Sequence, residues 1–264
     1  MSEQQNESIR IAKKQKGCIG CYEFVYKSLD STMNQAKELA EKNFPDGTVV
    51  IAETQTQGIG RNGRIWISPR GGLWLSIVFR PRIEIGYMFI FSYMISLSVA
   101  EAIKKIGADP KIKWPNDILL ENKKVAGILI DSKSTDKEVK YIIAGIGINV
   151  NNKIPRLSDS AIEGISIREY LGRDVDINLV KRYLYDSLEK NYSIINKSKG
   201  YYLEIFKKWD NFNFLKGRTV RIYDKRFSNP KLGKVIGINL NTGGLIVEIN
   251  SKKFEVFDTV TIRT

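Results

Sequence analysis

The sequence predicts an α+β protein, in which a mixed β-sheet with helices is followed by a small C-terminal β-barrel. Residues 30–150 contain several apolar runs of strand length together with two helical patterns, and helical patterns then dominate residues 166–210. After residue 216 the sequence changes to short β-type runs separated by Gly, Asn and Lys, as in small barrels. We therefore expect one large domain and one small domain, with the boundary near residue 213.

The first predicted elements run from residue 30 to residue 80. Asp30 or Ser31 can cap a helix that continues to about Lys42, with small and apolar side chains on one face. A buried strand is predicted at Thr48–Thr54, and another strand, rich in large apolar residues, at Leu73–Arg80. A glycine-rich loop separates the two strands.

The stretch Ile85–Ala100 carries no charge, which raises the question of a membrane span. It has sixteen residues, three of them serine, whereas a span needs roughly 20 apolar residues. We therefore expect a buried central helix and no membrane association. The first twenty residues are polar and basic without an apolar segment, so we expect no secretory signal, a loose N-terminal stretch and a cytoplasmic protein.

Residues 111–150 are predicted to form extended pieces and one hairpin. Pro115 divides two short pieces, and Asn122-Lys123 then marks a tight turn into a strand at Lys124–Asp131. A further strand at Tyr141–Val150 ends in the sequence Gly-Ile-Gly-Ile-Asn-Val. The short runs predicted for the C-terminal barrel are Thr219–Tyr223, Lys234–Asn239, Leu245–Ile249, Phe254–Phe257 and Thr259–Arg263.

The composition narrows the chemistry that the chain can perform. Its 42 Lys and Arg residues against 29 Asp and Glu residues give a formal charge of +13, which favours acidic ligands or partners. The chain contains no histidine, which excludes histidine triads, imidazole bases and zinc sites that use histidine. Proton transfer must therefore use a carboxylate, a lysine, a tyrosine or a group of the substrate itself.

Cys18 and Cys21 are the only two cysteines. Without a second pair or a histidine they cannot complete a four-ligand zinc site within one chain. A redox or dimer-bridging role stays open. We expect two incidental thiols in a reducing cytoplasm, where disulfides are rare.

The loop from Gly58 to Pro69 is the most informative segment of the chain. Three glycines and two arginines fall within the seven residues 58–64. Glycine lets backbone N–H groups approach a ligand closely, and the planar fork of arginine matches phosphate or carboxylate. We therefore predict a mobile loop that holds an anionic small molecule.

Three segments in fixed order closely resemble the biotin protein ligases, the enzymes that attach biotin to a lysine of a carrier protein. They are Gly58–Ser76, Lys113–Asp117 with its continuation Lys124–Asp131, and Gly145–Val150. The sequence Leu29-Asp-Ser-Thr32 at the start of the first helix fits the same pattern. Each motif alone is weak, but their conjunction in order is specific and spans roughly residues 22 to 264.

The resemblance implies a particular organisation. After a polar extension at residues 1–21, we expect a catalytic domain similar to class II aminoacyl-tRNA synthetases at residues 22–213, and then an SH3-like barrel at residues 214–264. An N-terminal DNA-binding domain is not expected, so the chain resembles the stand-alone enzyme. Two departures stand out: Ile59 replaces a residue that is often basic, and Met33 replaces a common asparagine.

The family reaction, by this resemblance, has two steps. Biotin and ATP, with Mg2+, give biotinyl-5′-AMP and pyrophosphate, and a lysine of a biotin carboxyl carrier protein then displaces AMP. Arg61, Lys124 and Asp117 are the expected catalytic residues, because two anions must meet in a site of preorganised charge. Asp117 could orient or deprotonate the incoming lysine, or it could hold the phosphate region through Mg2+.

The resemblance also implies two sets of binding residues. The expected biotin residues are Ser31, Thr32, Gln55, Gly58, Ile59, Gly60, Arg61, Lys124 and Gly127. The expected ATP and adenylate residues are Arg61, Asn62, Gly63, Arg64, Trp66, Lys113, Asn116 and Asn149. Trp66 would cover the ligand near adenine or could be a core residue, and Gly145 and Gly147 could serve close strand packing instead.

Two other functions compete with this interpretation. A lipoate–protein ligase shares the fold and chemistry, but the Arg-Arg-x-Ser-Gly-Gly-Gly stretch and the histidine segment typical of those enzymes are missing. A nucleic-acid-binding protein would fit the basic charge, yet Tyr223–Phe227 is the only hint of aromatic residues among basic ones. We therefore expect no DNA partner, and the resemblance implies a homodimer.

Overall fold

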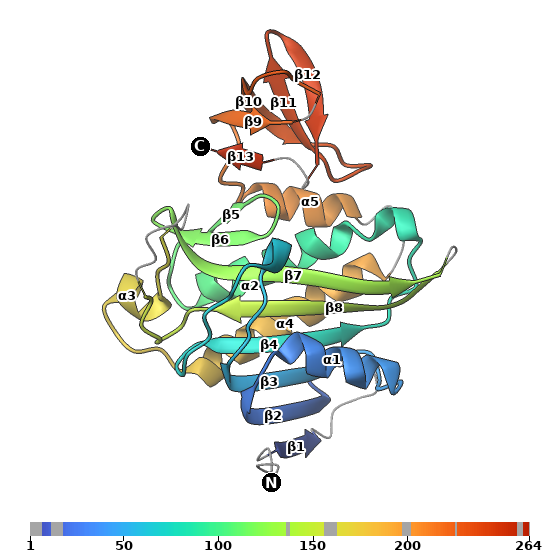
Figure 1. The fold of residues 1–264 in the computed structure, drawn as a ribbon, viewed down its shortest axis with the longest axis vertical. Coiled ribbons are helices and arrows are strands. Elements are labelled where there is room, and N and C mark those ends of the chain that lie inside the picture. The colour runs from blue at the N-terminus through green and yellow to red at the C-terminus, as the bar shows by residue number, and fades with distance from the viewer. Residues whose placement is uncertain are drawn as a thin grey trace.

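The computed structural model describes residues 7–11, 18–135, 138–155, 163–196, 202–224, 226–257 and 261–263. Its larger sheet consists of β1 (Glu7–Ile11), β2 (Tyr22–Leu29), β3 (Thr48–Gln55), β4 (Leu73–Phe79), β5 (Lys111–Lys113), β6 (Asp117–Leu120), β7 (Lys123–Ser134) and β8 (Val139–Ile148). These eight strands lie in the order β1-β2-β3-β4-β8-β7-β6-β5 (Figure 1). The pair β2–β3 is parallel and the other neighbouring pairs are antiparallel, so the predicted mixed sheet is confirmed.

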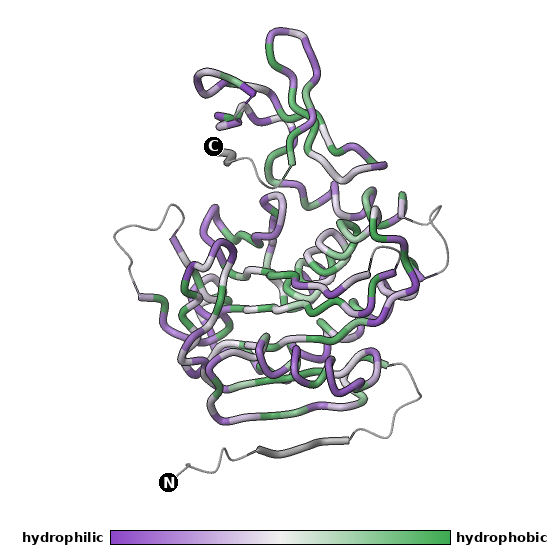
Figure 2. The backbone as a smooth tube through the Cα atoms, turned by 45° about the vertical axis from the view of Figure 1, so that its right-hand side comes forward, coloured by the Kyte–Doolittle hydropathy of each residue, from purple (hydrophilic) through white to green (hydrophobic). Residues whose placement is uncertain are grey.

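Helices cover both faces of this sheet. The helices of the chain are α1 (Thr32–Glu41), α2 (Ile90–Lys105), α3 (Ile167–Leu171), α4 (Ile177–Ile195) and α5 (Tyr202–Asp210), with short 3-10 turns at η1 (Arg61–Gly63) and η2 (Ile85–Tyr87). In Figure 1, α1 lies in front of the strands and α2 and α4 lie behind them. Figure 2 shows that α1 is mostly hydrophilic, whereas apolar stretches concentrate in the central strands.

Alternation along β4 divides the core between the two faces. Leu75 and Ile77 belong to the large cluster that includes α2, whereas Val78 belongs to a smaller cluster beneath α1. Side chains of a strand point to opposite faces in turn, so Trp74 and Ser76 share the α1 face with Val78. Thr32, one of the residues predicted for the functional site, contacts Ser76 on this face.

The central helix α2 confirms the expectation of a buried apolar helix. Twelve of its sixteen residues are buried, and it packs against α4, α5 and β7. By length and composition alone, the stretch Ile85–Lys105 would suffice to cross a membrane, and most of it lies inside the fold. The apolar run is therefore explained by the core of the large domain.

The C-terminal part forms a five-stranded antiparallel sheet, as the barrel-type pattern predicted. It consists of β9 (Thr219–Tyr223), β10 (Lys231–Ile238), β11 (Leu245–Ile249), β12 (Lys252–Val256) and β13 (Thr261–Arg263). β10 and β12 begin earlier than expected, and residues 259 and 260, at the start of the last predicted run, lie outside the described residues. The sheet lies at the top of Figure 1, next to α5.

This second sheet is joined to the first by the connecting segment and by α2. The backbone of Ile112 in β5 accepts from Phe214 N at 2.9 Å and donates to Phe212 O at 2.7 Å. The hydroxyl of Tyr93 in α2 donates to the carbonyl of Gly243 at 2.6 Å and accepts from Trp114 Nε1 at 2.9 Å. The predicted boundary near residue 213 thus falls in a segment hydrogen-bonded to β5.

The beginning of the chain differs from the loose stretch that we expected. β1 pairs antiparallel with β2 over five residues, and β2 itself was not predicted. Glu23 interrupts the apolar character of β2, but it is 9% exposed and bound by Lys181 Nζ at 3.0 Å and by Tyr185 Oη at 2.7 Å. These partners come from α4, so the sequence near β2 does not reveal them.

The two cysteines also differ from the expected pair of thiols. Cys18 and Cys21 form a disulfide, with 5.5 Å between their Cα atoms. Gly20 lies between them with φ of 76°, a left-handed conformation that glycine adopts readily, and its N–H donates to Gly47 O at 2.8 Å. This turn brings the two side chains together.

The hairpin turn lies one residue earlier than predicted. Leu120 pairs with Lys123, and Glu121 and Asn122 between them have φ of 49° and 63°. Two left-handed residues make the tight turn whose twist matches a hairpin, and asparagine tolerates that conformation. Lys123 therefore begins β7 and is not part of the turn.

Candidate functional site

A lysine and a carboxylate meet at the start of the β6–β7 hairpin. Lys124 Nζ lies 2.7 Å from Asp117 Oδ1, and both side chains are about a quarter exposed, at 27% and 22%. The backbone of Lys124 is fixed on both sides, because its N–H donates to Glu163 O at 2.7 Å and its carbonyl accepts from Ile165 N at 3.0 Å. Two of the predicted catalytic residues are thus in direct contact.

Trp66 lies on a floor of glycines next to this pair. Its ring is 5.0 Å from Lys124 Nζ and packs edge-on against Trp74 at 6.5 Å. Gly127 and Gly147 face each other in β7 and β8, and a Cβ atom on them would lie 3.0 Å and 2.4 Å from the indole. Gly147 therefore makes room for an aromatic side chain, which corrects the alternative of close strand packing.

Arg61 connects the glycine-rich loop to the segment before β6. Its Nη1 donates to Asn116 Oδ1 at 3.1 Å, and Asn116 Nδ2 donates to Ile128 O at 2.6 Å. Asn116 is 9% exposed, so the amide is a fixed anchor for the guanidinium. The third predicted catalytic residue therefore reaches the neighbourhood of Asp117.

Lys113 adds another cation to this region. Burial lowers the pKa of Lys113, and the nearby charge of Lys124 lowers it as well, whereas the carboxylate of Asp117 raises it. Desolvation disfavours the charged form of a lysine, so keeping Lys113 protonated in the site costs free energy. An anionic ligand would relieve that cost.

Neutral hydrogen-bonding residues form a second cluster on the same face. Thr32 donates to Gln55 Oε1 from its N–H at 2.9 Å and from its hydroxyl at 3.1 Å, and its hydroxyl is 2.8 Å from that of Ser76. Gln55 Nε2 donates to Ser68 Oγ at 2.7 Å, and Ser68 donates to Trp66 O at 2.9 Å. The chain of contacts joins the neutral cluster to the charged one.

Gly58 and Ser31 shape the border of the neutral cluster. A Cβ on Gly58 would lie 2.2 Å from Trp66 O and 3.2 Å from Gln55 Nε2, so only glycine fits there. Ser31 caps α1, because its hydroxyl oxygen accepts from Met33 N at 3.3 Å and leaves the hydroxyl hydrogen for another acceptor. Both residues were predicted for the biotin site.

The glycine-rich loop has a hairpin-like conformation in the structure, and its mobility stays a prediction. Gly60 N donates to Arg64 O at 2.7 Å, Trp66 N donates to Gly58 O at 2.8 Å, and Asn62 has φ of 57°. Asn62 and Arg64, like Gly63 between them, are exposed at the tip of the loop and are not brought to the glycine floor. Three of the predicted ATP residues are therefore exposed on the loop, whereas the others lie near Lys124 and Asp117.

Asn149 supports the charged cluster from the end of β8. It is 6% exposed, its Nδ2 lies 3.5 Å from Lys124 O, and its N–H donates to Val125 O at 2.8 Å. The structure therefore places this predicted ATP residue beside the backbone of the central lysine.

Two hollows open beside the site. One, of about 310 Å³, is lined by Met33, Asn34, Lys37, Ile59, Gly60, Leu129, Ile130 and Asp131, so both departures from the family pattern border it. Met33 also lies against β8 at Gly145, where a Cβ would be 2.6 Å from its sulfur. This hollow continues the predicted biotin region.

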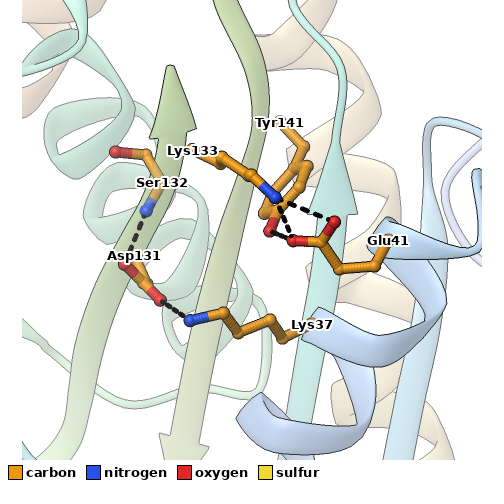
Figure 3. Close-up of a pocket in the computed structure, with 6 residues that line it drawn as sticks. All are labelled: Lys37, Glu41, Asp131, Ser132, Lys133 and Tyr141. Carbon is orange, nitrogen blue, oxygen red and sulfur yellow. Dashed lines mark hydrogen bonds and ion pairs between the residues drawn. The ribbon is translucent and has the colours of Figure 1, made fainter. Parts of the chain in front are cut away.

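The second hollow, of about 250 Å³, is a polar pocket under the end of α1 (Figure 3). Its charges are matched in pairs: Lys133 lies 2.7 Å from Glu41, and Lys37 lies 3.7 Å from Asp131. Burial, followed by the hydrogen bond to Glu41, raises the pKa of Tyr141 to about 12, so its hydroxyl stays protonated at neutral pH. These contacts hold α1 on the sheet.

Sequence reasoning missed two members of the neutral cluster, Ser68 and Ser76. Both are buried, at 3% and 0% exposure. Ser76 could have been noticed, because it is the one polar residue in the apolar run Leu73–Phe79. Ser68 carried no comparable signal.

The arrangement suits a ligand with one neutral polar end and one anionic end. Lys124, Arg61 and Lys113 supply positive charge at one side, and Thr32 and Gln55 supply hydrogen bonds at the other. Among the described residues, no three Asp, Glu or Cys side chains gather as a metal site would require.

Comparisons with known proteins identify the family to which the chain is similar. The sequence model of the biotin/lipoate A/B protein ligase family matches residues 25–149. The chain is 32% identical over 225 residues to the bifunctional ligase/repressor BirA of Bacillus subtilis, across 84% of this chain and 68% of that protein. It is 36% identical over 124 residues to the biotin--[acetyl-CoA-carboxylase] ligase of Paracoccus denitrificans, across 46% of this chain and 51% of that protein.

The fold is likewise similar to a solved structure, the biotin protein ligase from Aquifex aeolicus in complex with biotin and ATP. The TM-score is 0.76 with 28% sequence identity, and the match covers 91% of this chain and 98% of that chain.

Proposed function

The chain belongs to the biotin protein ligases, and we propose that it activates biotin with ATP and transfers it to a lysine of a biotin carboxyl carrier protein. In the first step an oxygen of the biotin carboxylate bonds to the α-phosphorus, the bond to the β-phosphate oxygen breaks, and pyrophosphate leaves. In the second step the lysine nitrogen bonds to the acyl carbon and loses a proton, the bond from that carbon to the phosphate oxygen breaks, and AMP leaves. Biotinyl-5′-AMP is the intermediate.

The observation that carries this proposal is the hydrogen-bonding polarity of the neutral cluster. Both lone pairs of Gln55 Oε1 are used by Thr32, and one N–H of Gln55 Nε2 is used by Ser68. The cluster therefore offers the second N–H of Gln55 as a donor and the oxygen of Thr32 as an acceptor. A cyclic urea has the complementary pair, one carbonyl and adjacent N–H groups.

The same polarity argues against lipoate as the substrate. A dithiolane ring has neither an N–H nor a carbonyl, so it would leave these polar groups unmatched once it displaced water. A site built to hydrogen-bond a substrate rejects an analogue without those groups by a large factor, because unpaired buried polar atoms are costly. Biotin therefore fits the cluster and lipoate does not.

The charged cluster is suited to the reacting end of the substrates. We assign Lys124 and Arg61 to the biotin carboxylate and the α-phosphate, where preorganised charge stabilises the transition state of a reaction between two anions. Lys113 would serve the phosphates. Asp117 orients Lys124 through their 2.7 Å contact, and the incoming carrier lysine could displace that contact in the second step.

Trp66 and the exposed loop tip would complete the nucleotide site. The indole offers an apolar face for adenine, and closure of the loop would bring Arg64 and Asn62 from solvent to the phosphates. We propose that Mg2+ enters with the triphosphate of ATP as part of the substrate.

Two further properties are proposed from the family. We expect a homodimer, which light scattering on the purified protein would measure, and we expect the enzyme to work in the cytoplasm beside its carrier protein. Formation of the Cys18–Cys21 disulfide in the cell can be tested by thiol labelling under denaturing conditions, and a fully oxidised pair would contradict a cytoplasmic location.

The direct test of the activity is exchange of radiolabelled pyrophosphate into ATP. Exchange should require biotin, should not occur when lipoate replaces it, and should be followed by labelling of a carrier domain with biotin. Exchange supported by lipoate but not by biotin would reject the proposal. Salt-sensitive binding of an oligonucleotide without any biotin-dependent exchange would favour a nucleic-acid-binding protein instead.

A further inference from the structure

We propose that Ser76 is a positioning residue for biotin, which acts by fixing the direction of the Thr32 hydroxyl. This inference rests on the proposed function, because it assigns Thr32 to the ureido ring. It adds a residue that lies beneath the ligand site and is not expected to touch the ligand.

The surroundings of Ser76 are apolar. It is 0% exposed in β4, it shares its sheet face with Trp74 and Val78, and its cross-strand neighbours are Val50 and Gly145. A hydroxyl in such a place is costly unless it is hydrogen-bonded, and an alanine would pack there without that cost. Its described partner is the hydroxyl of Thr32 at 2.8 Å.

Counting hydrogens fixes the direction of every bond in the cluster. Ser68 donates to a carbonyl, so it must accept from Gln55 Nε2, and the Thr32 N–H can donate only to Gln55 Oε1. These two contacts set the orientation of the Gln55 amide. The single hydrogen of the Thr32 hydroxyl is then spent on Gln55 Oε1, so Ser76 must be the donor to Thr32.

This direction decides what the ligand meets. With Ser76 donating from below and Gln55 accepting the hydrogen of Thr32, the oxygen of Thr32 has one lone pair left, and it can only accept. An N–H of the ureido ring matches that lone pair. Without Ser76, the Thr32 hydroxyl loses one of its two constraints and is less well ordered before biotin arrives.

The test compares Ser76→Ala with Ser98→Ala. Ser98 is also 0% exposed and hydrogen-bonded, but it lies in α2 and donates to Met94 O at 2.8 Å, away from the site. We expect Ser76→Ala to raise the KM for biotin roughly fivefold to tenfold, the effect of one net hydrogen bond, with kcat and the KM for ATP unchanged. Ser98→Ala should change thermal stability only.

A double-mutant cycle tests whether Ser76 acts through Thr32. Thr32→Val removes the hydroxyl that Ser76 orients, so Ser76→Ala should change the KM for biotin by less than about twofold in that background. Ser76→Cys keeps a weak hydrogen-bond donor, so its KM for biotin should lie between those of the unaltered enzyme and Ser76→Ala. Independent, multiplying effects of the two substitutions would overturn the inference, as would an unchanged KM in folded Ser76→Ala.

The failure of this inference can be told apart from failure of the proposed function. If the unaltered protein shows no biotin-dependent exchange, the function itself is rejected and the inference falls with it. If exchange is normal and Ser76→Ala binds biotin like the unaltered protein, only the role of Ser76 is overturned.

Discussion

Gly147→Ala should weaken the use of ATP by moving Trp66. A Cβ at this position would lie 2.4 Å from Trp66 Nε1, whereas ordinary contacts begin near 3.4 Å, so the indole must retreat by about 1 Å. Gly147 is not among the glycines with positive φ, so the backbone itself accepts alanine. Overpacking of this kind costs about 1–3 kcal/mol. Displacement of the ring from Lys124 Nζ, now 5.0 Å away, would add about 0.5–1 kcal/mol.

The expected result is a rise of roughly tenfold or more in the KM for ATP, since about 1.4 kcal/mol corresponds to a factor of ten. The KM for biotin should change less, because the side-chain hydrogen bonds that join Thr32, Gln55, Ser68 and Ser76 do not involve the indole ring. The measurement is pyrophosphate exchange at varied ATP and saturating biotin, with a thermal melt to show that the variant is folded.

Gly237→Ala is the matched control. Gly237 also lies in a strand, β10, and a Cβ there would meet no atom within 4 Å. It should leave both KM values unchanged. A folded Gly147→Ala enzyme with an unaltered KM for ATP would refute the assignment of Trp66 to the nucleotide.

Three other substitutions test the charged cluster. Lys124→Ala should reduce biotin-dependent exchange roughly 100-fold or more, and near-normal exchange would reject its role. Arg61→Gly should still form the adenylate but release it, so added primary amines and unrelated proteins become biotinylated; unchanged carrier selectivity would count against this role. Asp117→Asn removes the charge that raises the pKa of Lys113 against burial, so Lys113 should lose its proton at lower pH. The alkaline rise in the KM for ATP should then begin at lower pH than in the unaltered enzyme, measured between about pH 7 and 10.

Local pattern was sufficient to predict several elements of the fold. The strand at Thr48–Gln55 and the helix α2 follow from apolar runs whose length and flanks are visible in the sequence. β2 was missed because Glu23 breaks its pattern, and the Lys181 partner that makes its burial tolerable is 158 residues away. Pairings over such distances depend on tertiary structure.

In the site, too, some features could be predicted from the sequence and others depend on tertiary structure. Motif order was enough to select Lys124 and Asp117, and the structure places them in contact. The need for glycine at position 147 could not be predicted from the sequence, because it depends on the position that the loop gives to the Trp66 side chain. Ser76 stands out in the sequence as the one polar residue of its strand, but its role could not be predicted, because its partner Thr32 is brought to it only when α1 packs on β4.

The link between α2 and the second sheet has a consequence for how such ligases can be recombined. A truncated chain that stops before β9 would lack Gly243, whose carbonyl accepts the hydrogen bond of the Tyr93 hydroxyl. Tyr93 in turn accepts a hydrogen bond from Trp114, which directly precedes the Pro-Asn-Asp segment of the site. The C-terminal domain therefore contributes to the structure of the catalytic domain. A chimaera that replaces this domain with that of another ligase should also include residues 212–214 and an α2 surface from the same donor. Otherwise the hydrogen bonds that support the segment before Asp117 will be lost.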